Sequence, residues 1–153
     1  MTELLSTNWT EHALAAVASA GRRAGGARRA IVEFLGEQRC CVTAQEIFDG
    51  LRVERRAVGI ASVYRVLDQL VALRLVQRLD VSGSIARYEP VRPGGEHHHH
   101  IVCDDCGRVD AFEDERLERV LGSLARRVSY EVAAHEVVLR GACVDCRPAA
   151  AVP

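Results

Sequence analysis

Two Cys-x-x-Cys pairs are the residues best suited to chemistry in this sequence. The first pair is Cys103 and Cys106, and the second is Cys143 and Cys146. Each pair can offer two thiolates from one tight turn, and a chain that folds back between the pairs assembles the ligand set of a tetrahedral structural zinc site. Two disulfides or redox-active dithiols are the alternative, but nothing in the sequence indicates an oxidising compartment. The pattern therefore predicts a Cys₄ site that holds structural Zn²⁺.

A run of four histidines precedes the first cysteine pair and continues directly into Ile101-Val102. A purification tag is the trivial explanation, but tags lie at chain ends, whereas this run is internal. We interpret the run as the start of a strand, in which successive side chains point to opposite faces. His97 and His99 are then expected on one face, and His98 and His100 on the other. The run predicts two pairs of ligands for two different metal sites.

Length and composition set the outer limits of the interpretation. A chain of 153 residues with 48% hydrophobic content fits one or two small globular domains. The sequence shows no apolar run of membrane-spanning length and no signal peptide, so we expect a cytoplasmic protein without a membrane partner. The formal net charge of −1 does not by itself indicate a nucleic-acid partner.

The N-terminal half shows the pattern of several short helices. Thr10 is expected to cap a first helix that ends near Gly21. A basic, glycine-containing loop over 22–29 opens a second helix with a core-facing apolar stripe. Thr43 and Glu46 have the spacing of a capping box and predict the start of a third helix.

A fourth, longer amphipathic helix is expected from Ser62 or just before it, and the hydrophobic period changes after it ends. Segments 75–80 and 85–89 alternate as strands do and flank the turn at 81–84. Short helices followed by a longer helix and a hairpin predict a winged helix-turn-helix domain over residues 1–90.

The C-terminal half mixes strands with one helix, so the predicted fold class is α+β. Proline and two glycines stop regular structure in a hinge over 91–97. The expected elements beyond it are a strand at 98–103, a strand near 108–112, a helix from about Asp114, and a final strand from Tyr130 to Leu139 that leads into the second cysteine pair. They form a domain over 98–147, followed by a frayed tail at 148–153.

Two stretches carry a resemblance to a known family. Residues 59–67, Gly-Ile-Ala-Ser-Val-Tyr-Arg-Val-Leu, resemble the recognition helix of the Fur (ferric uptake regulator) superfamily. His97 to Cys106 followed by the second cysteine pair resembles the metal-binding dimerisation domain of that superfamily, and the likeness extends from about Arg22 to Cys146. The resemblance implies a winged-helix DNA-binding domain, a hinge, and an α/β dimerisation domain. It also implies a metal-activated homodimeric repressor that binds palindromic double-stranded DNA operators.

The resemblance implies roles for three residues at the DNA. Tyr64 and Arg65 match the Tyr and Arg that enter the major groove, where Arg can bind guanine bidentately and Tyr can pack on a thymine methyl group. Arg28 matches a basic residue that touches DNA at the start of the second helix, and Arg23 is a weaker candidate. Without the resemblance, Arg65 would be interpreted as a solvated helix residue and Tyr64 as a core residue.

The resemblance also implies two regulatory metal sites. The ligands of the first site are His97, His99, Glu118 and His135. The ligands of the second, which joins the two domains, are Cys41, Glu89, His98 and His100.

The second ligand set departs from every metal subtype of the superfamily. Cys41 stands where iron-type members have His, and Ala111 where peroxide-sensing members have an acid. The Asp and Cys that actinobacterial zinc-sensing members use fall on Gln77 and Val91. One thiolate with imidazoles and a carboxylate suits tetrahedral Zn²⁺ better than Fe²⁺. We therefore expect regulatory Zn²⁺, with Fe²⁺ as the alternative metal and iron or peroxide sensing as the alternative functions.

Two other classes of protein are compatible with parts of the sequence. A zinc hydrolase could use Cys41 with a histidine as a nucleophile pair, or histidines with Glu118 around a catalytic zinc. A zinc-ribbon interaction module would account for the cysteines alone. Neither explains the helix-turn-helix, so we expect no enzymatic activity and no small organic substrate. DNA binding measured with added metal and with chelator distinguishes the three classes.

Overall fold

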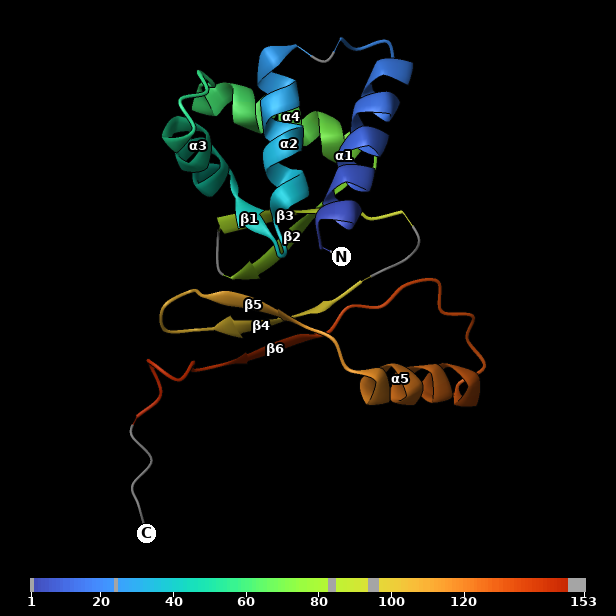
Figure 1. The fold of residues 1–153 in the computed structure, drawn as a ribbon. Helices are drawn as coiled ribbons and strands as arrows, with labels where there is room; N and C mark the ends of the chain where they lie inside the picture. Colours follow the sequence, from blue (N-terminus) through green and yellow to red (C-terminus); the bar gives the residue numbers. More distant parts are fainter. Residues whose placement is uncertain (1, 24, 83–84, 94–96, 149–153) are drawn as a thin grey trace. The chain divides into compact units, whose positions relative to one another are not determined.

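The structure is a computed structural model that describes residues 2–23, 25–82, 85–93 and 97–148 and divides into two compact units, residues 1–96 and 97–153. The fold is α+β, as the sequence predicts, because each unit combines α-helix with a β-sheet (Figure 1). Parts of the predicted turn (83–84), hinge (94–96) and tail (149–153) lie outside the described residues, as does residue 24. Among the described residues, no helix has the length and apolar character needed to cross a bilayer.

The described part of the first unit contains four helices. They are α1 (Thr2–Ser19), α2 (Gly26–Glu37), α3 (Ala44–Val53) and α4 (Ile60–Ala72). The start expected for the first helix was wrong, because α1 begins at Thr2 and Thr10 lies inside it. The helix extends past Trp9, whose fully buried indole donates to the Leu75 carbonyl at 3.3 Å and fixes this part of α1 to the core.

The predicted capping box at the start of α3 is confirmed. The Glu46 amide donates to Thr43 Oγ1 at 3.0 Å, and the Thr43 amide donates to Glu46 Oε2 at 2.7 Å. Two helix-terminal amides that lack intrahelical partners are satisfied in this way. Gly50, farther along α3, packs closely against α2, because a Cβ built on it would overlap the Phe34 ring.

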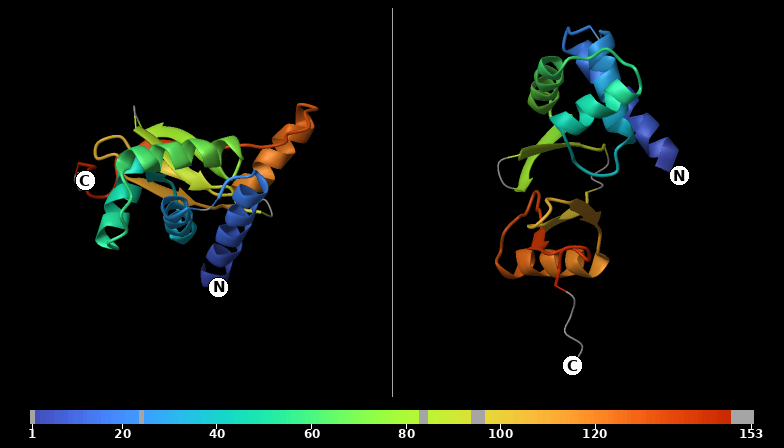
Figure 2. Two further views of the ribbon diagram at one scale, coloured as in Figure 1. Left: turned by 90° about the horizontal axis from the view of Figure 1, so that it is seen from above. Right: turned by 90° about the vertical axis from the view of Figure 1, so that its left-hand side faces the viewer.

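One hydrophobic core holds the first unit together. It takes Trp9, Ala13 and Val17 from α1, and the predicted apolar stripes of α2 and α4 point into it: Ile31 and Leu35, and Val63, Val66, Leu67 and Leu70. The four helices lie on one face of a small sheet, which Figure 2 shows from two further sides.

The sheet of the first unit has the strand order β1-β3-β2 and is antiparallel. Its strands are β1 (Val42–Thr43), β2 (Val76–Ser82) and β3 (Ile85–Pro90). Strands β2 and β3 form the predicted hairpin after α4, and their register places Gln77 opposite Glu89. The hairpin thus brings Glu89, a predicted ligand, to a defined position next to an amide side chain.

The second unit has a three-stranded sheet of order β5-β4-β6. Strands β4 (His99–Cys103) and β5 (Val109–Phe112) are antiparallel, whereas β6 (Val138–Gly141) pairs parallel to β4. The final strand expected from Tyr130 was wrong over most of its length, because 130–137 has no regular structure. A strand forms only where its backbone finds a partner, and the partner β4 begins pairing at His100 opposite Val138.

Helix α5 (Glu115–Arg127) begins where the sequence predicts. Asp114 caps it by accepting hydrogen bonds from the amides of Arg116 and Leu117 at 2.7 and 2.9 Å. The helix is strongly amphipathic, yet none of its residues is buried, and Val120 is 62% exposed. Its apolar face is therefore only partly covered in the single chain.

Candidate functional site

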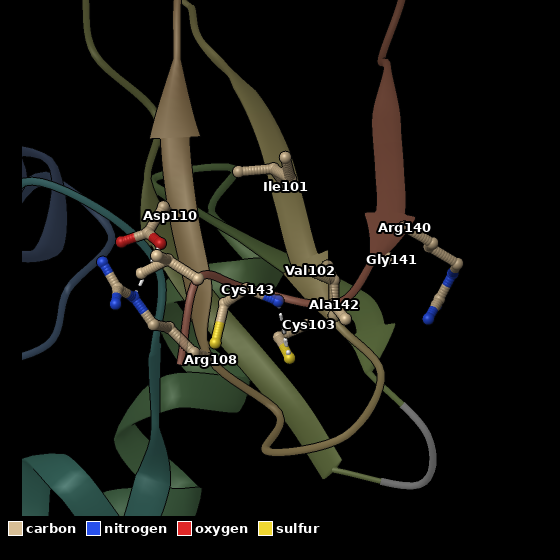
Figure 3. Close-up of a pocket in the computed structure, with 10 residues that line it drawn as sticks. Ile101, Val102, Cys103, Arg108, Asp110, Arg140, Gly141, Ala142 and Cys143 are labelled. Carbon is tan, nitrogen blue, oxygen red and sulfur yellow. Dashed lines mark hydrogen bonds and ion pairs between the residues drawn. The ribbon is translucent and has the colours of Figure 1, made fainter. Parts of the chain in front are cut away.

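The four cysteines of the two Cys-x-x-Cys pairs converge in the second unit. Their sulfur atoms all lie within 4.8 Å of one another. Cys103 ends β4, and Cys143 follows β6, so the parallel pairing of these strands brings the two Cys-x-x-Cys turns together. Figure 3 shows the sulfur atoms of Cys103 and Cys143 side by side at the strand ends. Gly107 permits the turn after the first pair, because its φ of +75° is left-handed and favours glycine.

The electrostatics of this cluster favour a cation. The Cys143 amide donates to Cys103 Sγ at 3.3 Å, and this bond, followed by that of the Cys106 amide, lowers the pKa of Cys103 to about 6. The pKa of Cys146 is raised, by hydrogen bonds with Cys143 and then with Cys106. Adjacent thiolates repel one another unless a cation shares their charge. The Cys106 and Cys143 sulfurs are 3.9 Å apart, too far for the roughly 2 Å of a disulfide, and the structure has no disulfide among the residues that it describes.

A second cluster joins His97, His99, Glu118 and His135. Glu118 lies at its centre: His99 Nε2 is 2.7 Å from Oε1, His135 Nε2 is 3.0 Å from Oε2, and His97 Nε2 is 3.5 Å from Oε1. The hydrogen bond with His99 is the largest cause of the lowered pKa of Glu118. All four residues offer their ligand atoms within 4.8 Å of one another. Three imidazoles and a carboxylate form a set that suits Zn²⁺, Fe²⁺ or Mn²⁺.

Different elements position the members of this cluster. His97 lies just before β4 and His99 is the first residue of that strand. Glu118 lies in the first turn of α5, and His135 lies in the irregular segment before β6. The sequence predicted that His135 lies on the last strand, but the structure places it in an irregular segment. Its side chain nevertheless reaches Glu118. The Val137 amide donates to His99 Nδ1 at 3.3 Å and fixes the ring orientation. A metal bound here would replace the hydrogen bonds among these side chains and release protons.

The other two histidines of the run pair on the opposite face of β4. The rings of His98 and His100 have centroids 5.1 Å apart, and their ligand nitrogens lie within 4.8 Å of each other. Ala111 pairs directly with His100 across the sheet, so the residue opposite His100 on β5 offers no carboxylate. The predicted alternation of the histidines is therefore seen in the structure.

The first unit holds the other predicted ligands of the second site. Glu89 is buried, and its Oε2 accepts a hydrogen bond from Gln77 Nε2 at 2.9 Å. Cys41 is buried, with 5% of its surface exposed, and its sulfur lies 3.8 Å from that of Cys40. The pKa of Cys41 is raised, first by its hydrogen bond with Cys40 and then by burial, and the negative charge of Glu89 adds to the effect. Burial and these neighbours therefore favour the thiol of Cys41 over its thiolate.

Sequence reasoning missed two residues near these ligands. The sulfur of Cys40 and a carboxylate oxygen of Glu89 lie within 4.8 Å of each other, which makes Cys40 a competitor of Cys41 as the thiol ligand. Glu136 Oε1 lies 3.9 Å from His100 Nδ1 in the second unit. In the sequence, only the position of Glu136 next to His135 points to a role at a metal site. Its proximity to His100 depends on the pairing of β6 with β4.

The predicted DNA residues lie on two helices of the first unit. Tyr64 and Arg65 are exposed at the N-terminal end of α4, opposite the face that packs into the core. Tyr64 is 50% exposed, which excludes the core role that the sequence left open for it. Arg28 lies in the first turn of α2, and Arg23 is exposed in the loop before it. The three arginines, Arg23, Arg28 and Arg65, line one hollow.

The fold and these clusters define a metal-binding protein with histidine- and cysteine-rich clusters in one unit and a helix with a basic, exposed end in the other. A sequence model of the ferric uptake regulator family matches residues 19–140. The ferric uptake regulation protein of Legionella pneumophila is 36% identical over 106 residues, which are 69% of this chain and 76% of that protein. The chain therefore belongs to the ferric uptake regulator family and is a metal-responsive transcriptional regulator.

Solved structures show the same likeness. The ferric uptake regulator of Vibrio cholerae has 31% identity and a TM-score of 0.73, with 84% of this chain and 97% of that chain covered. The ferric uptake regulator of Pseudomonas aeruginosa, solved with manganese, has 29% identity and a TM-score of 0.69, with 84% and 95% covered. The relatives are named as regulators and not as enzymes.

Proposed function

We propose that this protein is a zinc-responsive repressor that binds palindromic DNA operators as a homodimer when its regulatory sites hold metal. The observation that carries the proposal is the exposure of Tyr64 and Arg65 on α4, whose opposite face is held in the core of the first unit. A helix fixed in this way can enter the major groove with its N-terminal residues at the base edges. The hairpin β2–β3 is the wing of a winged helix-turn-helix.

The second unit offers the surface that a homodimer needs. Its exposed large apolar side chains are Ile101, Val120, Leu124, Val128, Tyr130, Val132, Leu139 and Val144. So many uncovered apolar groups in a small unit indicate an interaction surface. A second copy of the chain is the occupant that also places two α4 helices on the two half-sites of a palindrome.

Structural Zn²⁺ is proposed for the Cys₄ cluster of Cys103, Cys106, Cys143 and Cys146. The set matches a closed tetrahedral site, which stabilises a fold and leaves no open position for catalysis. Bound metal keeps the four thiols reduced, as expected for a cytoplasmic protein.

Regulatory metal is proposed for two ligand sets. The first is the cluster His97, His99, Glu118 and His135. The second takes His98 and His100 from one unit and Glu89 with a thiol, assigned to Cys41, from the other. Ligands drawn from two units link their positions to metal binding, and a coupling of about 1–3 kcal/mol changes DNA affinity about 5- to 150-fold.

The thiol favours zinc as the effector of the second site. Thiolate ligands suit Zn²⁺, whereas Fe²⁺ binds more often to nitrogen and oxygen ligands. The buried thiol beside Glu89 is neutral without metal, so its deprotonation would accompany metal binding. Iron sensing is the second candidate function, because the cluster around Glu118 contains only nitrogen and oxygen ligands.

The test is the affinity of the full-length protein for DNA, measured by fluorescence anisotropy against buffered Zn²⁺ and, without oxygen, against buffered Fe²⁺. The DNA is a duplex selected from a random pool by the metal-loaded protein. Tighter binding at lower free Zn²⁺ than free Fe²⁺, reversed by chelator, supports zinc sensing. The opposite order of metals assigns the protein to iron sensing, and metal-independent binding contradicts both proposals.

The ligand from the cysteine pair is tested by two matched variants. Cys41→Ala is expected to lower zinc-dependent DNA binding by about 5- to 150-fold while the Cys₄ zinc and the dimer remain. Cys40→Ala is expected to do much less. Reversal of this order assigns the ligand to Cys40, which is near Glu89. Full zinc activation of both variants contradicts a thiol ligand and removes the main argument for zinc over iron.

A further inference from the structure

The Arg28 side chain is held by two different parts of the first unit. Its Nε and one terminal nitrogen both donate to Gln69 Oε1, at 3.2 and 2.8 Å. Its other terminal nitrogen donates to the Arg23 carbonyl in the loop before α2. Gln69 lies in α4, so the bonds of this one guanidinium tie the start of α2 to the recognition helix and to the loop.

These bonds leave part of the guanidinium available. Arginine has five N–H donors in a planar fork. Gln69 takes the Nε–H and one terminal N–H, and the Arg23 carbonyl takes a third. One N–H on each terminal nitrogen remains, and two such donors can bind a phosphate oxygen pair. The side chain lines the hollow that Arg23 and Arg65 also line, so further positive charge adjoins these donors.

The partner that orients the Arg28 guanidinium, the Gln69 amide, carries no charge. A carboxylate at position 69 would orient the guanidinium equally well, but it would cancel the positive charge that attracts phosphate. An amide oxygen orients without cancelling charge. Arginine otherwise loses rotamer freedom when it binds, and an orientation already fixed before binding reduces that cost.

We propose that Gln69 is a positioning residue for DNA binding: it holds the Arg28 guanidinium in the orientation that contacts a backbone phosphate. Because Gln69 also belongs to α4, the phosphate contact of α2 keeps a constant position relative to Arg65. The phosphate contact then sets the register in which the recognition helix meets the bases. This inference rests on the proposed DNA binding.

The experiment measures the DNA affinity of the metal-loaded dimer by fluorescence anisotropy over a series of salt concentrations. The probes are the selected duplex and a random-sequence duplex of equal length. The variants are Gln69→Ala, Arg28→Ala and the double variant. Gln45→Ala is the matched control, because Gln45 is an exposed helical glutamine whose side chain donates to Asp49 on its own helix, at 3.0 Å. Thermal unfolding of each variant shows whether the fold is kept.

Gln69→Ala is expected to lower affinity for both duplexes by about 2- to 10-fold per protomer, because Arg28 must then be ordered on binding. The dependence of affinity on salt should stay unchanged, since the charge remains. Arg28→Ala should reduce the logarithmic salt slope by about 1 for each phosphate that the protein no longer binds. In the Arg28→Ala background, Gln69→Ala should have no further effect. Gln69→Glu should reduce the salt slope as Arg28→Ala does.

Several outcomes would overturn the proposal. A Gln69→Ala protein with wild-type affinity contradicts a positioning role, and so does an equal loss in the presence and absence of Arg28, which would indicate a merely structural effect. A loss as large in Gln45→Ala has the same meaning. Failure of the wild-type dimer to bind either duplex at any metal concentration contradicts the proposed function itself, and is thereby distinguished from failure of the inference.

Discussion

The two units of this protein are stabilised in different ways. The first unit has a continuous apolar core drawn from four helices and a sheet. In the second unit, the buried residues among those described are Val102, Cys103, His99 and His100, and α5 contributes none. Half of that small set consists of polar histidines. A unit with so little apolar burial needs additional stabilisation, which small domains commonly obtain from metals or from oligomerisation.

The two units also differ in the features that they present. In the first unit, the core holds α4 rigidly and leaves Tyr64 and Arg65 at the surface. In the second, the strand β4 has candidate metal ligands at both of its ends, with histidines at the start and Cys103 at the finish. The first unit therefore presents a surface of fixed shape, whereas the second brings together candidate metal ligands.

The largest effect on the difference between the two units is expected from removing one thiol of the Cys₄ cluster. Cys143→Ser is expected to release the structural zinc and to unfold the second unit, because structural zinc contributes on the order of 10 kcal/mol to small metal-dependent domains. Zinc analysis, analytical ultracentrifugation and thermal unfolding measure the result. The helical signal of the first unit should persist. A Cys143→Ser protein that stays dimeric with unchanged thermal stability would contradict the assignment.

A core truncation in the first unit should have the opposite distribution of effects. Leu67→Ala removes a fully buried side chain and is expected to destabilise this unit by about 2–5 kcal/mol. The zinc content of the second unit should not change. Val120→Ala, on the exposed part of the apolar face of α5, is the control. It is expected to change the stability of a monomer little and to weaken the dimer. Urea unfolding followed by circular dichroism, with zinc analysis, tests both variants, and zinc loss from Leu67→Ala would show that the units are not independent.

The variant Arg65→Ala tests the proposed role of the first unit's surface in DNA binding. The change is expected to cost about 1–3 kcal/mol in operator binding and to relax preference at one base position, whereas Arg28→Ala should weaken binding to all sequences alike. Both proteins should keep their metal, because neither residue is a proposed ligand. Competition binding against a library of single-base operator variants measures the preference. Full affinity and specificity in Arg65→Ala would show that α4 does not read the bases through this residue.

The smallest effect on stability is expected at the C-terminal ends of α4 and α5, which have the same backbone conformation. Arg74 after α4 and Ser129 after α5 have positive φ values of 56° and 58°, and the amide of the next residue closes each helix end: Leu75 to Leu70 and Tyr130 to Ala125. Glycine prefers this position. Arg74→Gly and Ser129→Gly are each expected to stabilise their own unit by about 0.5 kcal/mol, the relief of left-handed strain less the added backbone entropy. Thermal unfolding of the zinc-loaded protein measures this gain, and a loss in either variant would mean that the side chain makes a contact worth more than the strain.

Local patterns predicted much of the fold and of the site. The Cys-x-x-Cys spacing, the Thr43–Glu46 capping box and the alternation of the histidines depend on near neighbours in the chain, and the structure contains all three. The apolar stripe of α4 likewise identified its buried face. Such patterns succeed because hydrogen bonding and side-chain direction within one element are set by the element itself.

Other features depended on partners far along the chain, so only the tertiary structure decided them. Trp9 bonds to Leu75 and fixes α1 to the core, and β6 is short because only part of the expected strand pairs with β4. The apolar stripe of α5 resembles a core stripe, but none of its residues is buried, because periodicity alone does not show which segment covers a face. Periodicity shows that a face is apolar, whereas burial, ligand convergence and the bond from Arg28 to Gln69 require two distant segments to meet.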